Sequence, residues 1–200
     1  MFIKVKEMKK IIEIPNGVEV SIEAKKIIVK GPKGELEKDF SNPVFNRFID
    51  IKKEQNKIII SSSTERRKFK ALVGTIRAHL RNMIKGVTDG YTAILRIHYL
   101  HFPINVTVKD KKIHIRNFLG EKGDRITDIV GDVKVDVGKG EIKITGINKE
   151  DVGQTAANIE QICAVKNKDR RIFQDGIFIY QKPMWDVYDG REKYSKEEKT

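Results

Sequence analysis

The sequence predicts an α+β fold: a tandem duplication of a small domain with an antiparallel-rich sheet and one main helix per copy. Two observations support this. Runs of alternating apolar and polar residues recur 86 residues apart. In each copy a stretch with apolar residues at three- and four-residue steps follows, and then Asp-Gly and another apolar run. Alternation is typical of half-buried strands, and the longer period is typical of amphipathic helices.

The strands come first in each copy. The alternating runs are 18–22 and 25–30 in the first copy and 104–108 and 111–116 in the second. Residues 57–61 and 141–145 predict a later strand in each copy. The segment Gly138-Lys139-Gly140 predicts a tight turn before the second of these strands. It does not fit a phosphate-binding loop, because the Walker spacing requires glycine where Val133 stands.

One helix then follows in each copy. The apolar stripes that predict the helices are Phe69, Leu72, Val73, Ile76 and Leu80 in the first copy, and Val152, Ala156, Ile159 and Cys163 in the second. Ser62 and Glu65 have the spacing of a capping box for the first helix. Asn148 is the expected N-cap of the second.

The repeat divides the chain into a first domain, 1–90, a second domain, 91–182, and a polar tail, 183–200. The strand at 91–99 enters the second domain, and we expect it also to close the sheet of the first. The tail carries Trp185 and Tyr188. Two interpretations of these aromatic residues stay open: they dock the tail on a partner, or they pack on their own domain.

The chain is strongly basic, with 40 Lys+Arg, 28 Asp+Glu, a net charge of +12 and a pI of about 9.6. The charge lies mainly in residues 1–90, which hold 20 Lys+Arg against 11 Asp+Glu. Nucleic acid is the commonest partner of such a chain, followed by an anionic membrane surface. A single cysteine, with no signal-peptide or transmembrane pattern, predicts a soluble intracellular protein.

No catalytic residue, metal site or cofactor is predicted. The histidines lack nearby cysteines, and scattered carboxylates such as Asp132 and Asp136 form no acid–base pair. His79 is expected beside the apolar stripe of its helix. Cys163 lies on the apolar stripe of the second helix, where it is expected to be a small buried hydrophobe.

Two basic clusters are candidates for contacts to phosphate. Lys166, Lys168, Arg170 and Arg171 follow the second helix, with only Asp169 opposing them. Arginine can hold a phosphate through two hydrogen bonds, and lysine acts as a point charge. Arg66, Arg67, Lys68 and Lys70 stand at the start of the first helix, where cations are unfavourable beside the positive end of the helix dipole. An ordinary solvated face is the favoured interpretation of this second cluster.

Three longer stretches carry a family resemblance. They are Lys30-Gly31-Pro32-Lys33-Gly34-Glu35-Leu36 with Asp39-Phe40; residues 101–106 with 115–122; and Gln161, Val165, Lys168, Arg171 and Phe173 with 175–179 and Lys182. In these stretches the chain resembles the large-subunit ribosomal protein family called L-six in bacteria and L-nine in eukaryotes. The third stretch resembles the eukaryotic and archaeal branch. The residues after Lys182 do not match the family.

The resemblance implies a duplicated fold and a non-catalytic constituent of the large ribosomal subunit. The implied position is near the translation-factor-binding region, beside the stalk base and the sarcin–ricin loop. The second domain is expected to make the main contacts to ribosomal RNA (rRNA). Neighbouring ribosomal proteins, with translation factors nearby, are the other implied partners. The implied localisation is the cytoplasmic ribosome, with a nucleolar stage during assembly if the source is eukaryotic.

The resemblance also selects RNA-binding residues. These are Lys166, Lys168, Arg170, Arg171 and Lys182, then Arg116, Asn117 and Lys122 around a second loop, and His101. For the loop at 117–122, a tight corner set by Gly120 is an equal alternative. The corner at 101–103 has a domain hinge as its alternative, and Gly31 and Gly34 are expected to shape a turn around Pro32.

Two other function classes share some of these features. A free-standing nucleic-acid-binding or chaperone-like module would have the same charge and fold, and a small enzyme could use the scattered carboxylates and histidines. Lys and Arg that neutralise phosphates release counterions, so binding should weaken steeply with salt. Co-sedimentation with the large subunit at low salt, and release at high salt, would favour the ribosomal class.

Overall fold

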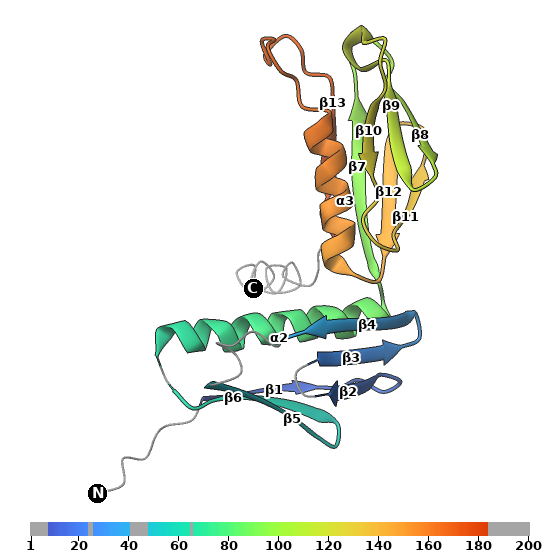
Figure 1. Ribbon diagram of the computed structural model, residues 1–200. Helices are drawn as coiled ribbons and strands as arrows, with labels where there is room; N and C mark the ends of the chain where they lie inside the picture. The colour runs from blue at the N-terminus through green and yellow to red at the C-terminus, as the bar shows by residue number, and fades with distance from the viewer. Residues whose placement is uncertain (1–7, 24–25, 41–47, 65, 184–200) are drawn as a thin grey trace, which may run out of the picture. The chain divides into compact units, whose positions relative to one another are not determined.

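The computed structural model describes residues 8–23, 26–40, 48–64 and 66–183. The chain divides into two compact units, Met1–Gly90 and Tyr91–Thr200 (Figure 1). Each unit is considered separately below. In the described residues, no helix is long and apolar enough to cross a membrane.

The first unit contains two three-stranded antiparallel sheets. One sheet has the order β1-β6-β5 and the other β2-β3-β4. The strands are β1 (Met8–Glu13), β2 (Glu19–Glu23), β3 (Lys26–Gly31), β4 (Gly34–Asp39), β5 (Ile49–Glu54) and β6 (Lys57–Ser62). Alternate residues of β3 and β6 are buried, as expected for strands with one face on a core.

The helix of this unit, α2 (Arg67–Thr88), packs on β1, β3, β4 and β6. Phe69, Val73, Ile76 and Leu80 from the predicted stripe are buried. The predicted capping box is wrong. The N-cap is Arg66, which makes no side-chain cap, and Ser62 belongs to β6, where its buried hydroxyl donates to the Thr64 carbonyl. Glu65 lies outside the described residues.

The β3–β4 hairpin lies against the C-terminal end of α2. The Lys33 amide donates to the Val87 carbonyl at 2.9 Å, and its ammonium donates to the Asp89 carbonyl. A Cβ at Gly31 would lie 2.6 Å from Val87 Cγ2, so only glycine permits this approach. Gly34 has a φ of +142°. The hairpin therefore satisfies helix-end carbonyls and places a cation at the negative end of the helix dipole.

The second unit contains a four-stranded sheet, β11-β12-β7-β13, and a three-stranded sheet, β10-β9-β8, both antiparallel. The elements are β7 (Tyr91–His98), β8 (Asn105–Lys109), β9 (Lys112–Arg116), a 3₁₀ turn (Phe118–Gly120), β10 (Arg125–Asp128), β11 (Lys134–Val137), β12 (Glu141–Gly146), α3 (Lys149–Ile162) and β13 (Gly176–Gln181). The turn predicted at 138–140 joins β11 and β12, with Gly140 at a φ of +81°.

The α3 helix packs on β7, β10, β12 and β13. Its predicted N-cap is confirmed, because the Asn148 side chain accepts a hydrogen bond from the Glu150 amide at 3.0 Å. Val152, Ala156, Ile159 and Cys163 are all buried in the core of this unit.

The predicted strand at 91–99 does not close the sheet of the first unit. It forms β7, which has β12 along one edge and β13 along the other. A strand has only two edges to offer, so β7 is fully occupied within the second unit.

The duplication is visible in the strand bounds. Both ends of β2 precede those of β8 by 86 residues, and the register of β2 on β3 returns at the same spacing in β8 on β9. The two copies differ after this point, because α2 has 22 residues and α3 has 14. In the second unit, the loop at 163–175 takes the place of the last helical turns. The α+β duplicated fold is thus confirmed.

Candidate RNA-binding surface

Three loops of the second unit gather at one end of its sheets (Figure 1). They are the β7–β8 loop (99–104), the β9–β10 loop (117–124) and the α3–β13 loop (163–175). The contacts described below hold these loops to one another. We call this region the loop end of the second unit.

Asp175 joins the α3–β13 loop to the β7–β8 loop. Its Oδ1 accepts hydrogen bonds from the amides of Leu100, at 2.9 Å, and His101, at 3.2 Å, and its Oδ2 lies 2.7 Å from His101 Nδ1. Burial alone raises the pKa of this carboxyl, but the hydrogen bonds from the His101 ring and the two amides outweigh it, so the Asp175 pKa is lowered. Asp175 is therefore a charged anchor inside the protein.

Phe173 adds an aromatic contact between the same two loops. The His101 ring stacks on Phe173, with ring centroids 4.9 Å apart, and the Lys168 ammonium lies 4.7 Å from the Phe173 centroid on its own loop. His101 is thus held by Asp175 and Phe173 together, and this fixes its orientation at the surface.

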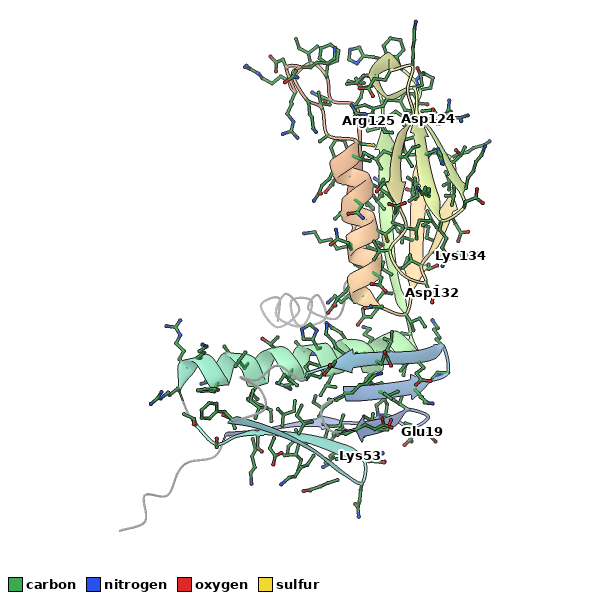
Figure 2. All side chains as sticks on the ribbon, viewed as in Figure 1. Glu19, Lys53, Asp124, Arg125, Asp132 and Lys134 are labelled. Atoms are coloured by element: carbon green, nitrogen blue, oxygen red, sulfur yellow. The ribbon has the colours of Figure 1, made fainter. Side chains whose placement is uncertain are left out.

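Arg125, at the start of β10, ties the β9–β10 loop to the end of α3. Its guanidinium binds both carboxylate oxygens of Glu121, at 2.6 and 2.8 Å, and donates to the carbonyls of Ile162 and Ala164. The Phe118 ring lies beneath it at 4.1 Å. The Glu121 hydrogen bond raises the Arg125 pKa, and the same bond lowers the Glu121 pKa. Figure 2 shows Arg125 at this end of the unit.

Asn117 and Gly120 shape the β9–β10 loop. Asn117 has a left-handed φ of +58°, and its side-chain amide donates to the Pro103 carbonyl at 3.0 Å. Gly120 has a φ of +77° and faces the Phe102 ring. These contacts support the structural interpretation of Asn117, and they bring the corner at 101–103 against the loop.

Arg116 is held in an ion pair. Its Nε lies 2.9 Å from Asp124 Oδ2, and His114 approaches the same oxygen at 3.6 Å. The Arg116 hydrogen bond, opposed by partial desolvation, lowers the Asp124 pKa. Lys122 is exposed at the tip of the loop, and no ion pair joins it to any described residue.

The predicted basic cluster stands on the α3–β13 loop. Lys166, Lys168, Arg170 and Arg171 are all exposed. Asp169 accepts a hydrogen bond from the Arg171 amide at 2.9 Å and lies 3.3 Å from its guanidinium, so the single acid of the cluster also shapes the turn. The described acids leave Lys166 and Arg170 without an ion-pair partner.

Lys182 lies away from this cluster. β13 begins at Gly176, opposite His98 at the loop end, and runs to Gln181, opposite Ile94. Six residues of strand carry Lys182 about 20 Å from the loop end.

A pocket of about 590 Å³ opens beside the α3–β13 loop. Its lining includes the aromatic residues His98, Phe173 and Phe178 and the polar residues Gln161, Arg170 and Gln174. Cys163 also contributes, and burial raises the pKa of its thiol to about 12, which keeps the thiol protonated at neutral pH. In the described residues, no three His, Cys, Asp or Glu side chains gather to hold a metal ion.

The structure brings together eight of the nine residues selected from the sequence and leaves Lys182 apart. Arg125 was not predicted from the sequence, and Glu121, Phe173 and Asp175 entered only as members of the family motifs. Each of these makes its decisive contact with residues distant in the chain, except for the local Arg125–Glu121 pair. The (i, i+4) spacing of that pair was its only detectable signal.

Comparisons with known proteins agree with this duplicated architecture. The family model for ribosomal protein L6 matches the chain twice, over residues 14–90 and 102–176. A protein of Methanothrix thermoacetophila, named large ribosomal subunit protein uL6, is 51% identical over 178 residues, which cover 89% of this chain and 99% of that protein. The uL6 of Staphylothermus marinus is 54% identical over 172 residues, 84% of this chain and 91% of its own length.

A third relative, uL6 of Methanosarcina mazei, is 48% identical over 178 residues, again 89% of this chain and 99% of the relative. At 84% to 89% of this chain, all three similarities extend into both units. With the two matches of the family model, they show that the chain belongs to the ribosomal protein L6 family, in the branch that archaeal uL6 and eukaryotic L9 share.

Proposed function

We propose that this protein is a structural, non-catalytic constituent of the large ribosomal subunit and binds large-subunit rRNA through the loop end of its second unit. Family membership supports the ribosomal role. The observation that carries the RNA contact is the exposed basic cluster at 166–171, which stands on loops held rigid by Asp175, Arg125 and Asn117.

The residues predicted from the sequence then fall into two roles. Lys122, Lys166, Lys168, Arg170 and Arg171 are exposed and contact phosphates directly, the arginines through bidentate hydrogen bonds. Three other residues, Arg116, Asn117 and His101, position these loops, and the outer edge of the His101 ring also contacts RNA. Lys182 makes a separate contact along β13.

The physical mechanism is electrostatic positioning. Phosphate contacts release counterions and make affinity dependent on salt, while loops shaped to the RNA set the register without reading base sequence. The aromatic pocket beside the cluster has the size and walls to accept one unstacked base.

The finer placement is also part of this proposal. The second domain, 91–182, makes the main RNA contacts near the factor-binding region, beside the stalk base and the sarcin–ricin loop. Neighbouring ribosomal proteins are direct partners, and translation factors bind close by. The protein acts on cytoplasmic ribosomes, and a nucleolar assembly stage applies only to a eukaryotic source. The tail beyond Pro183, with Trp185 and Tyr188, lies outside the described residues.

The test is incorporation into large subunits depleted of this protein. We expect the triple variant Lys168→Glu, Arg170→Glu and Arg171→Glu to incorporate at least about tenfold less at moderate salt, because each reversal removes a phosphate contact and adds repulsion. Its melting temperature should match that of the wild type, because these side chains are exposed. Sucrose-gradient sedimentation measures incorporation.

A matched control reverses three lysines at the opposite end of the same unit: Lys109, Lys112 and Lys134. This control changes the net charge equally and should incorporate normally. Wild-type incorporation of the loop variant would contradict the proposal.

A further inference from the structure

The outer face of α2 carries charges of one sign only. The helix contains six cations and no carboxylate: Arg67, Lys68, Lys70, Arg77, Arg81 and Lys85. The basic cluster recognised in the sequence is therefore only the first part of a longer series, and the interpretation as a solvated face has to account for the whole helix.

The cations lie opposite the core. The buried side of α2 carries Phe69, Val73, Ile76 and Leu80, and Figure 1 shows the strands of the unit on one side of the helix. The exposed side carries a row at three- and four-residue steps, which places its members along one stripe. This row is Arg67, Lys70, Gly74, Arg77 and Arg81, and all five residues are exposed.

Nothing within the described protein neutralises this row. No ion pair joins its four cations to a carboxylate among the described residues, whereas exposed lysines of β3 pair with glutamates of β4. Arg77 and Arg81 stand four residues apart, where like charges repel each other. An ordinary solvated helix usually alternates the two signs. Binding of an external polyanion to this row would therefore relieve the repulsion between its cations.

Gly74 interrupts the row at its centre without a structural reason in the fold. Among the described residues, apart from its chain neighbours and the backbone of its own helix, no heavy atom lies within 4 Å of a Cβ built at this position. Glycine weakens the interior of a helix, so a larger residue would be favoured if only this fold were concerned. The neighbouring exposed residues are also small: Ala71, Thr75 and Ala78. We call these four residues the α2 saddle.

The saddle separates the cations into two pairs. Arg67 and Lys70 precede it and Arg77 and Arg81 follow it, and seven residues of helix from Lys70 to Arg77 span about 10 Å. A narrow, convex and negatively charged strand laid across Gly74 would touch the helix backbone and meet cations on both sides.

We propose that the outer face of α2 is a second RNA-binding surface, across which the sugar–phosphate backbone of folded rRNA passes at Gly74. This inference rests on the proposed ribosomal function and adds the first unit to it. RNA fits better than an acidic protein, because the saddle offers no exposed apolar anchor of the kind that protein interfaces centre on. The three arginines also suit bidentate phosphate contacts.

The sharpest test fills the saddle. Gly74→Leu adds a side chain where the fold has open space, so the melting temperature should stay equal or rise. The same side chain obstructs the approach of an RNA strand, and affinity for intact large-subunit rRNA should fall about tenfold in filter-binding assays. If Gly74 had only a structural role, the substitution would not lower the affinity for rRNA while leaving the melting temperature unchanged or raised.

A second variant removes charge. Arg77→Gln with Arg81→Gln should reduce the slope of log affinity against log salt by about 2, because two phosphate contacts are lost. The control, Lys26→Gln with Lys30→Gln, removes the same charge from β3 of the same unit and should leave the slope unchanged. Both variants use the full chain and the same rRNA.

The outcomes separate this inference from the proposed function. If both α2 variants lose one hydroxyl-radical footprint on the rRNA, and the 168–171 variant loses another, the inference is supported. Wild-type affinity, slope and footprint in both α2 variants would overturn it and leave the loop surface intact. If the variants bind rRNA normally but fail to enter subunits, the face belongs to a protein partner and the inference is again overturned. A wild-type chain that ignores rRNA would overturn both proposals.

Discussion

Individual residues at the loop end have separate tasks, and burial distinguishes them. Asp175 is buried and satisfied by three hydrogen bonds, whereas Arg171 has 91% of its side chain exposed. A buried charged anchor can fix a loop because losing any of its partners leaves a desolvated charge. An exposed cation contributes little to stability and remains available to a ligand. The α3–β13 loop can therefore be held rigidly by its buried residue and bind a ligand through its exposed cations.

The anchor predicts a specific pH dependence. Because the pKa of Asp175 is lowered in the folded state, its stabilisation is present above the unfolded pKa of about 3.9 and is lost as pH falls through the folded pKa. Asp175→Asn should therefore cost about 1 to 3 kcal/mol at pH 7, and less at strongly acidic pH. Urea unfolding at both pH values measures this difference. Asp128→Asn, at an exposed carboxylate, is the control and should cost little at either pH.

If the loss of unfolding free energy in Asp175→Asn stays the same down to strongly acidic pH, the charge of Asp175 does not stabilise the fold.

At the scale of elements, a glycine of the β3–β4 hairpin and a glycine of α2 differ in whether the fold requires them. Gly31 is required by a close approach to Val87, while Gly74 stands in open space. The motif around Pro32, which carried part of the family resemblance, is thus a packing device that closes the C-terminal end of α2.

These two glycines predict stability changes of opposite sign. Gly31→Ala places a Cβ 2.9 Å from the Val87 carbonyl oxygen, and the forced backbone shift should cost about 1 to 3 kcal/mol. Gly74→Ala should stabilise the helix by up to about 1 kcal/mol. Thermal unfolding of the two variants, each compared with wild type, gives both signs directly. If both substitutions changed the melting temperature in the same direction, the two glycines would not differ in the way proposed.

The sequence predicted the elements well where the signal was local. Alternation predicted strands at 104–108 and 111–116, and the structure has them at Asn105–Lys109 and Lys112–Arg116. The glycines predicted the turn at 138–140, and Asn148 was identified as an N-cap. The capping box at Ser62 failed because strand pairing extends through that residue. The expectation that the strand at 91–99 also closes the sheet of the first unit was wrong, because the neighbours of a strand depend on tertiary contacts that a local sequence pattern does not contain.

Composition predicted the candidate site only as a set of exposed cations, and the family resemblance added Asn117 and His101. Their density at 166–171 is a property of composition, so it is visible in the chain. The contacts that make them a surface are not, because Asp175 meets His101 across 74 residues and Arg125 meets Ile162 across 37. Acidic residues are usually exposed, so the sequence alone gives no reason to expect that Asp175 is buried.

At the scale of the whole molecule, the two units have different charge and different surfaces. Most of the net positive charge lies in residues 1–90, yet the favoured RNA contact lies in the second unit. The RNA contact proposed for the outer face of α2 would account for this contrast, because the more basic unit would then also bind RNA. In this proposal the two copies bind the same polyanion through different elements, a long helix in one and the loop that replaces its end in the other.

The second unit alone provides a test of this division. Its core cluster is drawn entirely from residues between Tyr91 and Ile177, so we expect a fragment of residues 91–183 to unfold cooperatively in urea. The fragment should still bind large-subunit rRNA, with a salt slope smaller by about 3 to 4 than that of the full chain, because the four cations of the α2 row are missing. Filter binding between about 50 and 200 mM salt measures the slope. A folded fragment with the slope of the full chain would place all RNA contacts in the second unit, and a fragment without a cooperative transition would show that its core depends on the first.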